Sequence, residues 1–143
     1  MLDNRIKPLL DNIISPYQAN FVPGRKGTDN VIILQELVYL FGKRKGRQGD
    51  MIVNIDLEKS YDLLEWSFIR ETLIFFQFPT PVVNLILSCI CNTNISILIN
   101  GESSEVFSSS RGIRQGDLLS PYIFILCLEF ISLVMSKALD NGC

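Results

Sequence analysis

Apolar residues in the first part of the chain recur at the spacing of a helix. Between residues 6 and 14 they stand at Ile6, Leu9, Leu10, Ile13 and Ile14. Intervals of three and four residues place them on one face of an amphipathic helix. A second helix is predicted to begin at Thr28 or Asp29, which can cap it, and to run to about Phe41, with Gly42 as its stop.

The middle of the chain changes its pattern at Met51. Residues 51–55 form an apolar run without helical spacing, which predicts a short buried strand over residues 51–56. That strand would end in Asp56 and carry this carboxylate out of the core at a defined place. A helix is then predicted from Asp62 to about Phe76, with its apolar residues on one stripe.

The next pattern predicts a helix followed by a hairpin. Pro81 suits the first turn of a helix that continues to Cys91. Two extended segments follow, at residues 95–99 and 105–107. Between them lies Asn100-Gly101, a strong signal for a tight hairpin turn.

A long apolar helix is predicted near the end of the sequence. Ser120 would cap it and Pro121 would occupy its first position. Residues 122–135 are almost wholly apolar, interrupted by Glu129 and Ser132. This stretch is shorter than the roughly 20 residues that a membrane span needs, so a buried core helix is predicted, with no membrane contact. Helices mixed with a few short strands, without regular alternation, predict an α+β fold.

Composition limits the classes of function. The 143 residues include 48% hydrophobic residues, which suits a single domain with a sizeable core. The net charge of −2 gives no general attraction to nucleic acid, so a local basic patch would be needed. The best candidate is a run of four cations, for which a solvated loop is the commoner explanation. These cations are Lys43, Arg44, Lys45 and Arg47.

Two residue types exclude further chemistry. The absence of histidine rules out Ser-His and Cys-His catalysis, and any histidine-ligated metal site, within this chain. The four cysteines include no C-x-x-C pair, which favours reduced core thiols in an intracellular protein.

Carboxylates near Asp56 could hold a cation. Asp56, Glu58 and Asp62 lie within seven residues. Mg²⁺ prefers such oxygen ligands and often takes only one or two from protein. The alternatives are that Asp62 caps the helix it begins and that Glu58 is a surface charge. For Asp56 the residues leave a metal ligand and a plain strand end both open.

A second group of chemical interest is RGIRQGD at residues 111–117, just ahead of the long helix. Its glycines allow close approach of the backbone to a phosphate or a base, and Arg111 and Arg114 can bind phosphate. The alternative is a flexible connecting loop.

Together these motifs resemble the reverse transcriptase domain of non-LTR (LINE-type) retrotransposons, most closely those of plants. The resemblance covers essentially the whole chain. Its motifs are NRIKPLL at residues 4–10, ISP at 14–16, QANFVPGR at 18–25, TDN at 28–30, IDLEKSYD at 55–62, and RGIRQGD at 111–117 with Leu119-Ser120-Pro121-Tyr122. It implies a right-hand polymerase, with fingers over about residues 1–50 and the first part of the palm over about residues 51–143.

The resemblance also assigns roles. Asp56 would be the first catalytic carboxylate and bind Mg²⁺. The ring of Tyr61 would select dNTPs over NTPs, and the alternative for Tyr61 is an aromatic residue of the core. Gln115 and Gly116 would contact the incoming nucleotide and the template–primer, and Arg25 would contact the triphosphate or the template. The arginines of the 111–117 loop and the cations at 43–47 would contact nucleic acid. RNA template, DNA primer and dNTP are therefore the expected partners, and the nucleus is the expected location.

The sequence departs from the family pattern in three places. Leu118 stands where the family usually has proline, and Ser60 stands where it has alanine. The sequence ends at Cys143, before the family's aromatic-Ala-Asp-Asp hairpin, so the Mg²⁺ site is expected to be incomplete and this fragment inactive alone. The alternative is a decayed retroelement relic or a weak RNA-binding module. The oligomeric state is open.

Overall fold

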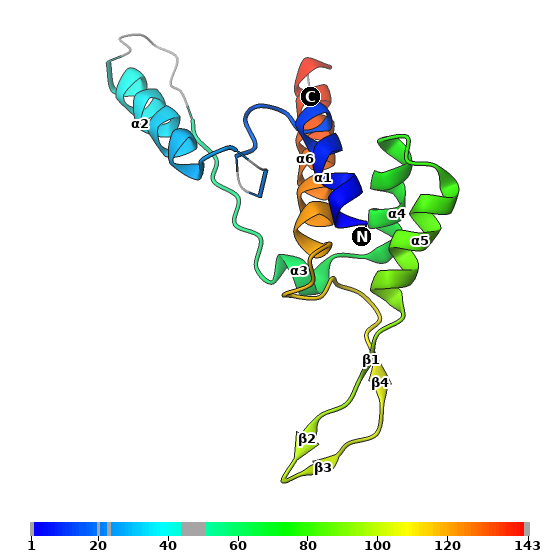
Figure 1. Ribbon diagram of the computed structural model, residues 1–143. Helices are drawn as coiled ribbons and strands as arrows, with labels where there is room; N and C mark the ends of the chain where they lie inside the picture. The colour runs from blue at the N-terminus through cyan, green and yellow to red at the C-terminus, as the bar shows by residue number, and fades with distance from the viewer. Residues whose placement is uncertain (1, 20, 23, 44–50, 142–143) are drawn as a thin grey trace.

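The computed structural model describes residues 2–19, 21–22, 24–43 and 51–141. Within them the chain forms helices and four two-residue strands (Figure 1). The helices are α1 (Asp3–Ile13), α2 (Gly27–Lys43), α3 (Ser60–Leu63), α4 (Trp66–Phe75), α5 (Thr80–Cys91) and α6 (Ser120–Asp140). The strands are β1 (Asn94–Ile95), β2 (Leu98–Ile99), β3 (Glu102–Ser103) and β4 (Phe107–Ser108). This helix-rich arrangement with small antiparallel pairs is compatible with the predicted α+β class.

Four helices build the hydrophobic core. α4 packs against both α5 and α6, and α1 packs against α6. Their fully buried side chains include Leu10, Ile69, Leu73, Ile86, Ile123 and Leu126. The helical spacing predicted for α1 is confirmed, because Ile6, Leu10 and Ile14 are all buried, although Leu9 is 45% exposed.

Helix α2 stands apart from this core (Figure 1). A helix at about the predicted position is confirmed, but it begins at Gly27, so Thr28 and Asp29 lie within its first turn and do not occupy the cap position. It also continues through Gly42 to Lys43, the last residue described before residue 51. No side chain of α2 is buried, and its apolar residues from Val31 to Leu40 are exposed. Burial of side chains in the core therefore does not stabilise α2 in this structure.

The buried strand predicted over residues 51–56 is wrong. These residues form no strand, and Met51, Val53 and Ile55 are 82%, 67% and 60% exposed. A strand needs a neighbour for its backbone hydrogen bonds, and the strands that the structure describes pair only among themselves. Apolar composition alone did not provide that neighbour.

The helix predicted from Asp62 to Phe76 is broken in two. Leu64 and Glu65 are extended and separate α3 from α4. The Leu64 carbonyl accepts a hydrogen bond from the N–H of Gly112 instead of continuing a helical ladder. The break therefore has a tertiary cause, which the local sequence does not reveal.

The hairpin prediction is confirmed at its turn. Asn100 and Gly101 have φ of +52° and +91°, the positive values that a two-residue hairpin turn of this class requires. β2 pairs with β3 across this turn, and β1 pairs with β4 farther back. The strands are shorter than predicted, and the returning strand begins at Glu102 rather than Glu105.

Helix α6 is only partly the predicted core helix. Pro121 lies in its first turn as expected, but Ser120 is a buried helical residue and Leu119 occupies the cap position without a side-chain cap. With 21 residues α6 is long and apolar enough to cross a membrane by length and composition alone, a test that core helices also pass. Its first half is buried in the core, whereas residues 131–141 are exposed.

Candidate functional site

The loop that follows β4 is docked on the turn formed by α3. The N–H of Ile113 donates to the Tyr61 carbonyl, and the N–H of Gly112 donates to the Leu64 carbonyl, both at 2.8 Å. The indole Nε1 of Trp66 donates to the Gly112 carbonyl, also at 2.8 Å. Three hydrogen bonds thus join the loop to the first motif and to the residues that directly follow it.

Gly112 is the point of closest contact. It is buried, its φ is +88°, and a Cβ placed on it would lie 2.8 Å from the Asp62 carbonyl oxygen. Real Cβ atoms do not approach backbone oxygens so closely, and the positive φ also disfavours any side chain. A glycine is therefore required here for the docking of the loop.

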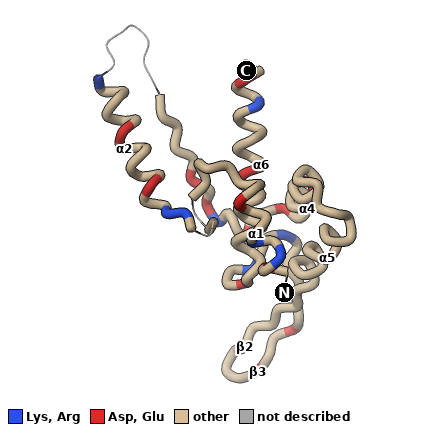
Figure 2. The backbone as a smooth tube through the Cα atoms, turned by 45° about the horizontal axis from the view of Figure 1, so that its top comes forward, with Lys and Arg blue, Asp and Glu red and all other residues tan. Residues whose placement is uncertain are grey.

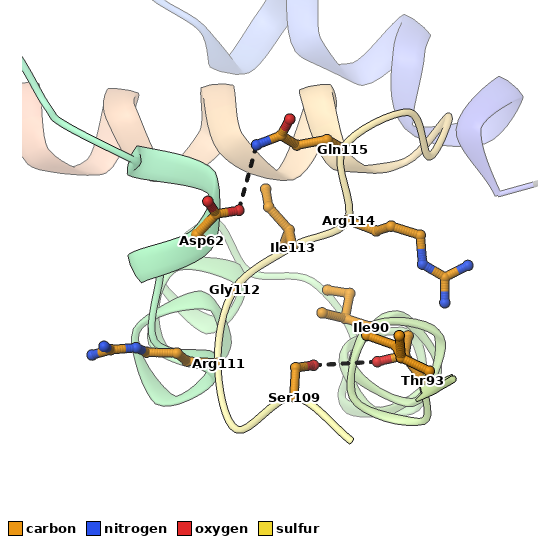
Figure 3. Close-up of a pocket in the computed structure, with 10 residues that line it drawn as sticks. Asp62, Ile90, Thr93, Ser109, Arg111, Gly112, Ile113, Arg114 and Gln115 are labelled. Carbon is orange, nitrogen blue, oxygen red and sulfur yellow. Dashed lines mark hydrogen bonds between the residues drawn. The ribbon is translucent and has the colours of Figure 1, made fainter. Parts of the chain in front are cut away.

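A pocket of about 400 Å³ opens beside this junction (Figure 3). It is lined by Asp62, Ile90, Thr93, Ile95, Ser109, Arg111, Gly112, Ile113, Arg114 and Gln115. The amide of Gln115 donates a long, 3.4 Å hydrogen bond to Oδ1 of Asp62. The hydroxyls of Thr93 and Ser109 lie 3.2 Å apart across the other side. Charged and hydrogen-bonding groups from three segments thus meet around one hollow.

Asp62 does not cap the helix that follows it. It lies in the first turn of α3, whose cap position is Lys59, and its carboxylate makes the bond to Gln115. The capping interpretation is therefore wrong. The reason is that the chain bends into α3 three residues before Asp62, at the left-handed Lys59 (φ +49°).

The two arginines of the loop extend to different sides (Figure 3). Arg111 pairs with Glu65 at 3.4 Å, and both side chains are at least half exposed. An ion pair so open to water contributes roughly 0–1 kcal/mol and leaves the guanidinium accessible. Arg114 extends on the side of Ile90 and Thr93, and it is exposed. Neither arginine is buried in the fold.

Asp56 lies at a different cavity. It is exposed and, with Glu58, lines a hollow of about 310 Å³ whose other residues are mostly apolar side chains of α3 and α6. No group of three His, Cys, Asp or Glu side chains that could hold a metal occurs in the described part of the chain. These residues alone do not fit a two-metal centre, because the hollow receives only two carboxylates.

Tyr61 is packed rather than open to a ligand. Its ring stacks on Phe124 of α6, with ring centroids 4.7 Å apart and planes inclined by 30°. Burial raises the pKa of its hydroxyl above the usual 10. In this structure Tyr61 is packed as an aromatic residue of the core, which is the alternative. Its predicted role in sugar selection stays a prediction.

The side chain of Arg25 forms hydrogen bonds within the chain. Its guanidinium donates to the carbonyls of Ile14, Ser15 and Gln18, which fastens the turn that follows α1. The contact with nucleotide predicted for Arg25 is untested. Gly116 has a φ of +89° and open space around it, so its backbone is accessible.

The basic run is only partly described. Lys43 lies at the end of α2 with its Nζ 4.4 Å from the ring centre of Tyr39. Arg44, Lys45 and Arg47 lie outside the described residues. Figure 2 shows the other cations spread over several elements with acidic residues among them. The described cations thus form no single basic face.

Sequence reasoning missed Trp66. It identified Gly112 as part of a motif but did not predict its contact with α3. What the sequence shows at this position is a glycine in a loop shortly before a predicted helix, which indicates a need for backbone freedom. A partner for the indole N–H of Trp66 could not be inferred, because it is 46 residues away.

The chain is similar to a known protein family over nearly its whole length. The family model described as "Reverse transcriptase (RNA-dependent DNA polymerase)" matches residues 1–141. The transposon TX1 149 kDa protein of Xenopus laevis is 28% identical over 96% of this chain. The Pol polyprotein from the type-2 retrotransposable element R2DM of Drosophila melanogaster is 32% identical over 80% of this chain. The chain spans 10% and 11% of the lengths of these two relatives.

A plant relative matches a shorter stretch. An uncharacterized mitochondrial protein of Arabidopsis thaliana is 43% identical over 37% of this chain, and the match covers 43% of that protein. This supports the plant-like character of the sequence only weakly. No solved structure matches the chain.

Proposed function

The chain belongs to the reverse transcriptase family, as part of a retrotransposon protein of the non-LTR type, and we propose on this basis that it contributes the nucleotide- and template-binding part of an RNA-directed DNA polymerase. The full reaction would add dNTPs to the 3′-hydroxyl of a DNA primer on an RNA template. In this proposal residues 1–50 belong to the fingers and residues 51–143 to the palm of a right-hand polymerase.

One observation supports this assignment most. The 111–115 loop is held by backbone hydrogen bonds to Tyr61 and Leu64 and lies against the backbone of Asp62, so the two motifs that carry the resemblance meet in space. Gln115 and Arg114 leave this junction toward a common pocket. Such a junction suits a site where one strand of nucleic acid and one nucleotide are bound together.

Asp56 is proposed as one carboxylate ligand of Mg²⁺ in the complete enzyme. A bound Mg²⁺ would stabilise charge on the attacking and leaving oxygens. The described residues supply only Asp56 and Glu58 at that cavity, so the remaining ligands would have to come from elsewhere in the complete enzyme. We expect this chain alone to extend no primer, and dNTP incorporation that survives Asp56→Ala would contradict both this expectation and the role of Asp56.

Binding of nucleic acid gives the direct test. The chain is titrated into a labelled RNA–DNA primer–template, and fluorescence anisotropy is recorded between about 50 and about 200 mM salt. We expect salt-sensitive binding that Arg114→Gln weakens. Arg5→Gln, an exposed change on α1 of the same charge, is the matched control. Absence of binding at low salt would favour the alternative of a relic without function.

Two finer proposals rest on the resemblance alone. Tyr61 is proposed to favour dNTPs over NTPs, so Tyr61→Val should raise the relative binding of NTPs to the chain–primer–template complex, and an unchanged ratio would reject the role. The protein is also proposed to act in the nucleus. A fluorescent fusion that stays in the cytoplasm during retrotransposition would reject that location.

A further inference from the structure

The loop at residues 111–116 has no regular secondary structure. The shape of its backbone therefore depends on the few hydrogen bonds that backbone groups of the loop make. Two of these are backbone bonds, from Gly112 to Leu64 and from Ile113 to Tyr61. The third comes from a side chain, the indole of Trp66, which donates to the carbonyl oxygen of Gly112.

We propose that Trp66 is a positioning residue for this loop, and hence for the nucleotide and template contacts of Gln115 and Arg114; this last step rests on the proposed function. Trp66 is not among the ten residues that line the pocket. Its effect on a ligand would therefore pass through Gly112, not through direct contact.

The position of Trp66 makes it a firm anchor. It is the first residue of α4, a helix whose Ile69, Thr72 and Leu73 are at most 1% exposed. α4 packs on both α5 and α6, and the ring of Trp66 itself packs against the core. The indole N–H is thus held by a helix that is packed into the hydrophobic core.

The bond from Trp66 completes a clamp on one residue. The N–H of Gly112 is bound to Leu64, and its carbonyl is bound to Trp66, two residues farther along. Both polar groups of Gly112 are therefore held by the segment that joins α3 to α4. With the side chain of Ile113 buried as well, the directions in which Arg114 and Gln115 leave the loop are fixed.

The clamp is tested by amide hydrogen exchange in Trp66→Phe, which keeps an aromatic ring and removes the N–H donor. We expect the amides of Gly112 and Ile113 to exchange about five- to tenfold faster, the effect of one lost hydrogen bond. The amide of Leu87, inside α5, should not change. Phe68→Leu is the control variant, because it alters α4 at its contact with Phe130 and leaves the clamp intact.

A second variant covers the case in which Trp66→Phe fails to fold. Gly112→Ala keeps the tryptophan and pushes the loop away, and Trp66 is the only tryptophan in the chain. We expect its emission to shift to the red while the amides of α4 stay protected. An unshifted emission, or equal acceleration of exchange throughout Trp66→Phe, would overturn the proposal.

Binding to the primer–template separates this proposal from the proposed function. Trp66→Phe, Gln115→Ala and the double variant are compared by anisotropy. We expect the loss of binding in the double variant to be smaller than the sum of the two single losses, because part of the effect of Trp66 passes through Gln115. Additive losses would mean that Trp66 acts independently of the loop, which overturns the proposal. If the unaltered chain binds nothing, the proposed function fails, and hydrogen exchange still decides the role of Trp66.

Discussion

Gly112 lies against the backbone of Asp62 so closely that no side chain fits between them. A Cβ on Gly112 would be 2.8 Å from the carbonyl oxygen of Asp62 and 3.1 Å from its Cα. The neighbours are backbone atoms of a helical turn, which cannot move aside as a side-chain tip can. The junction of the two motifs is therefore sensitive to a single methyl group.

Gly112→Ala is expected to destabilise the protein more than Gly101→Ala. Both glycines have φ near +90°, but Gly101 has open space where a Cβ would go. Backbone strain alone costs about 1–2 kcal/mol, and the contact with Asp62 should add about 1–3 kcal/mol at Gly112. Urea unfolding followed by Trp66 fluorescence measures both free energies. Equal losses would show that the contact with Asp62 is not limiting.

Arg25→Lys is expected to lower the free energy of unfolding by about 1–2 kcal/mol. The guanidinium reaches three carbonyls around the end of α1, and an ammonium on a flexible stem does not reproduce this fork. Lys26→Arg, at the exposed neighbouring position, is the control. Unchanged thermal unfolding of Arg25→Lys would remove the structural role of Arg25.

Thr72→Val is expected to stabilise the protein by about 1 kcal/mol. Thr72 is buried in α4, and its Oγ1 has no hydrogen-bond partner of normal geometry among the described residues. Valine has nearly the same shape without the hydroxyl. Ser67→Ala, on the exposed side of α4, serves as the control for helix propensity. A loss of stability in Thr72→Val would show that the hydroxyl has a partner after all.

Alkaline pH should destabilise the protein through Cys127. Burial raises the pKa of this thiol to about 12, although the nearby Thr72 hydroxyl opposes the increase. Below pH 9 the thiol is mostly protonated in both the folded and the unfolded chain, so the buried thiol contributes its full share to the free energy of unfolding. Above pH 9 the unfolded thiol ionises first, and stability falls, by about 1 kcal/mol between pH 9 and 10.

The measurement is urea unfolding at pH 8, 9 and 10 for the unaltered chain and for Cys127→Ala. Cys127→Ala is less stable at every pH because it loses core packing. Its free energy of unfolding should fall less between pH 9 and pH 10 than that of the unaltered chain, because it lacks this thiol. Burial also raises the pKa of Tyr61 and of Cys91, but both residues are present in the two proteins, so their contributions cancel in the comparison. The same slope in both proteins would assign the pH dependence to other groups.

Local signals in the sequence predicted the local features well. The buried face of α1 and the turn at Asn100-Gly101 depend on spacing and on backbone preferences within a few residues. The strand at 51–56 was wrong because pairing depends on a neighbour that composition does not specify. The break between α3 and α4 at Leu64 was not predicted, because the Gly112 N–H that binds the Leu64 carbonyl is 48 residues away along the chain.

The candidate site was predicted as separate motifs and not as one arrangement. Gln115 and Arg114 do share a pocket with Asp62, but Asp56 lies at another cavity. Helical or strand periodicity carries no information on which loops meet. The roles assigned to Asp56, Tyr61 and Arg25 therefore stay predictions.

The clamp between Trp66 and Gly112 has a consequence for the order of folding. It joins residues 46 positions apart, across α4, α5 and the hairpin. Closing such a long loop is entropically unfavourable until the intervening helices have packed, so we expect the two motifs to meet late. Doubling the length of the closed loop would cost only about 0.6 kcal/mol more. We therefore expect this chain to accept inserted sequence at the tip of the hairpin, Asn100-Gly101, without separation of its two motifs.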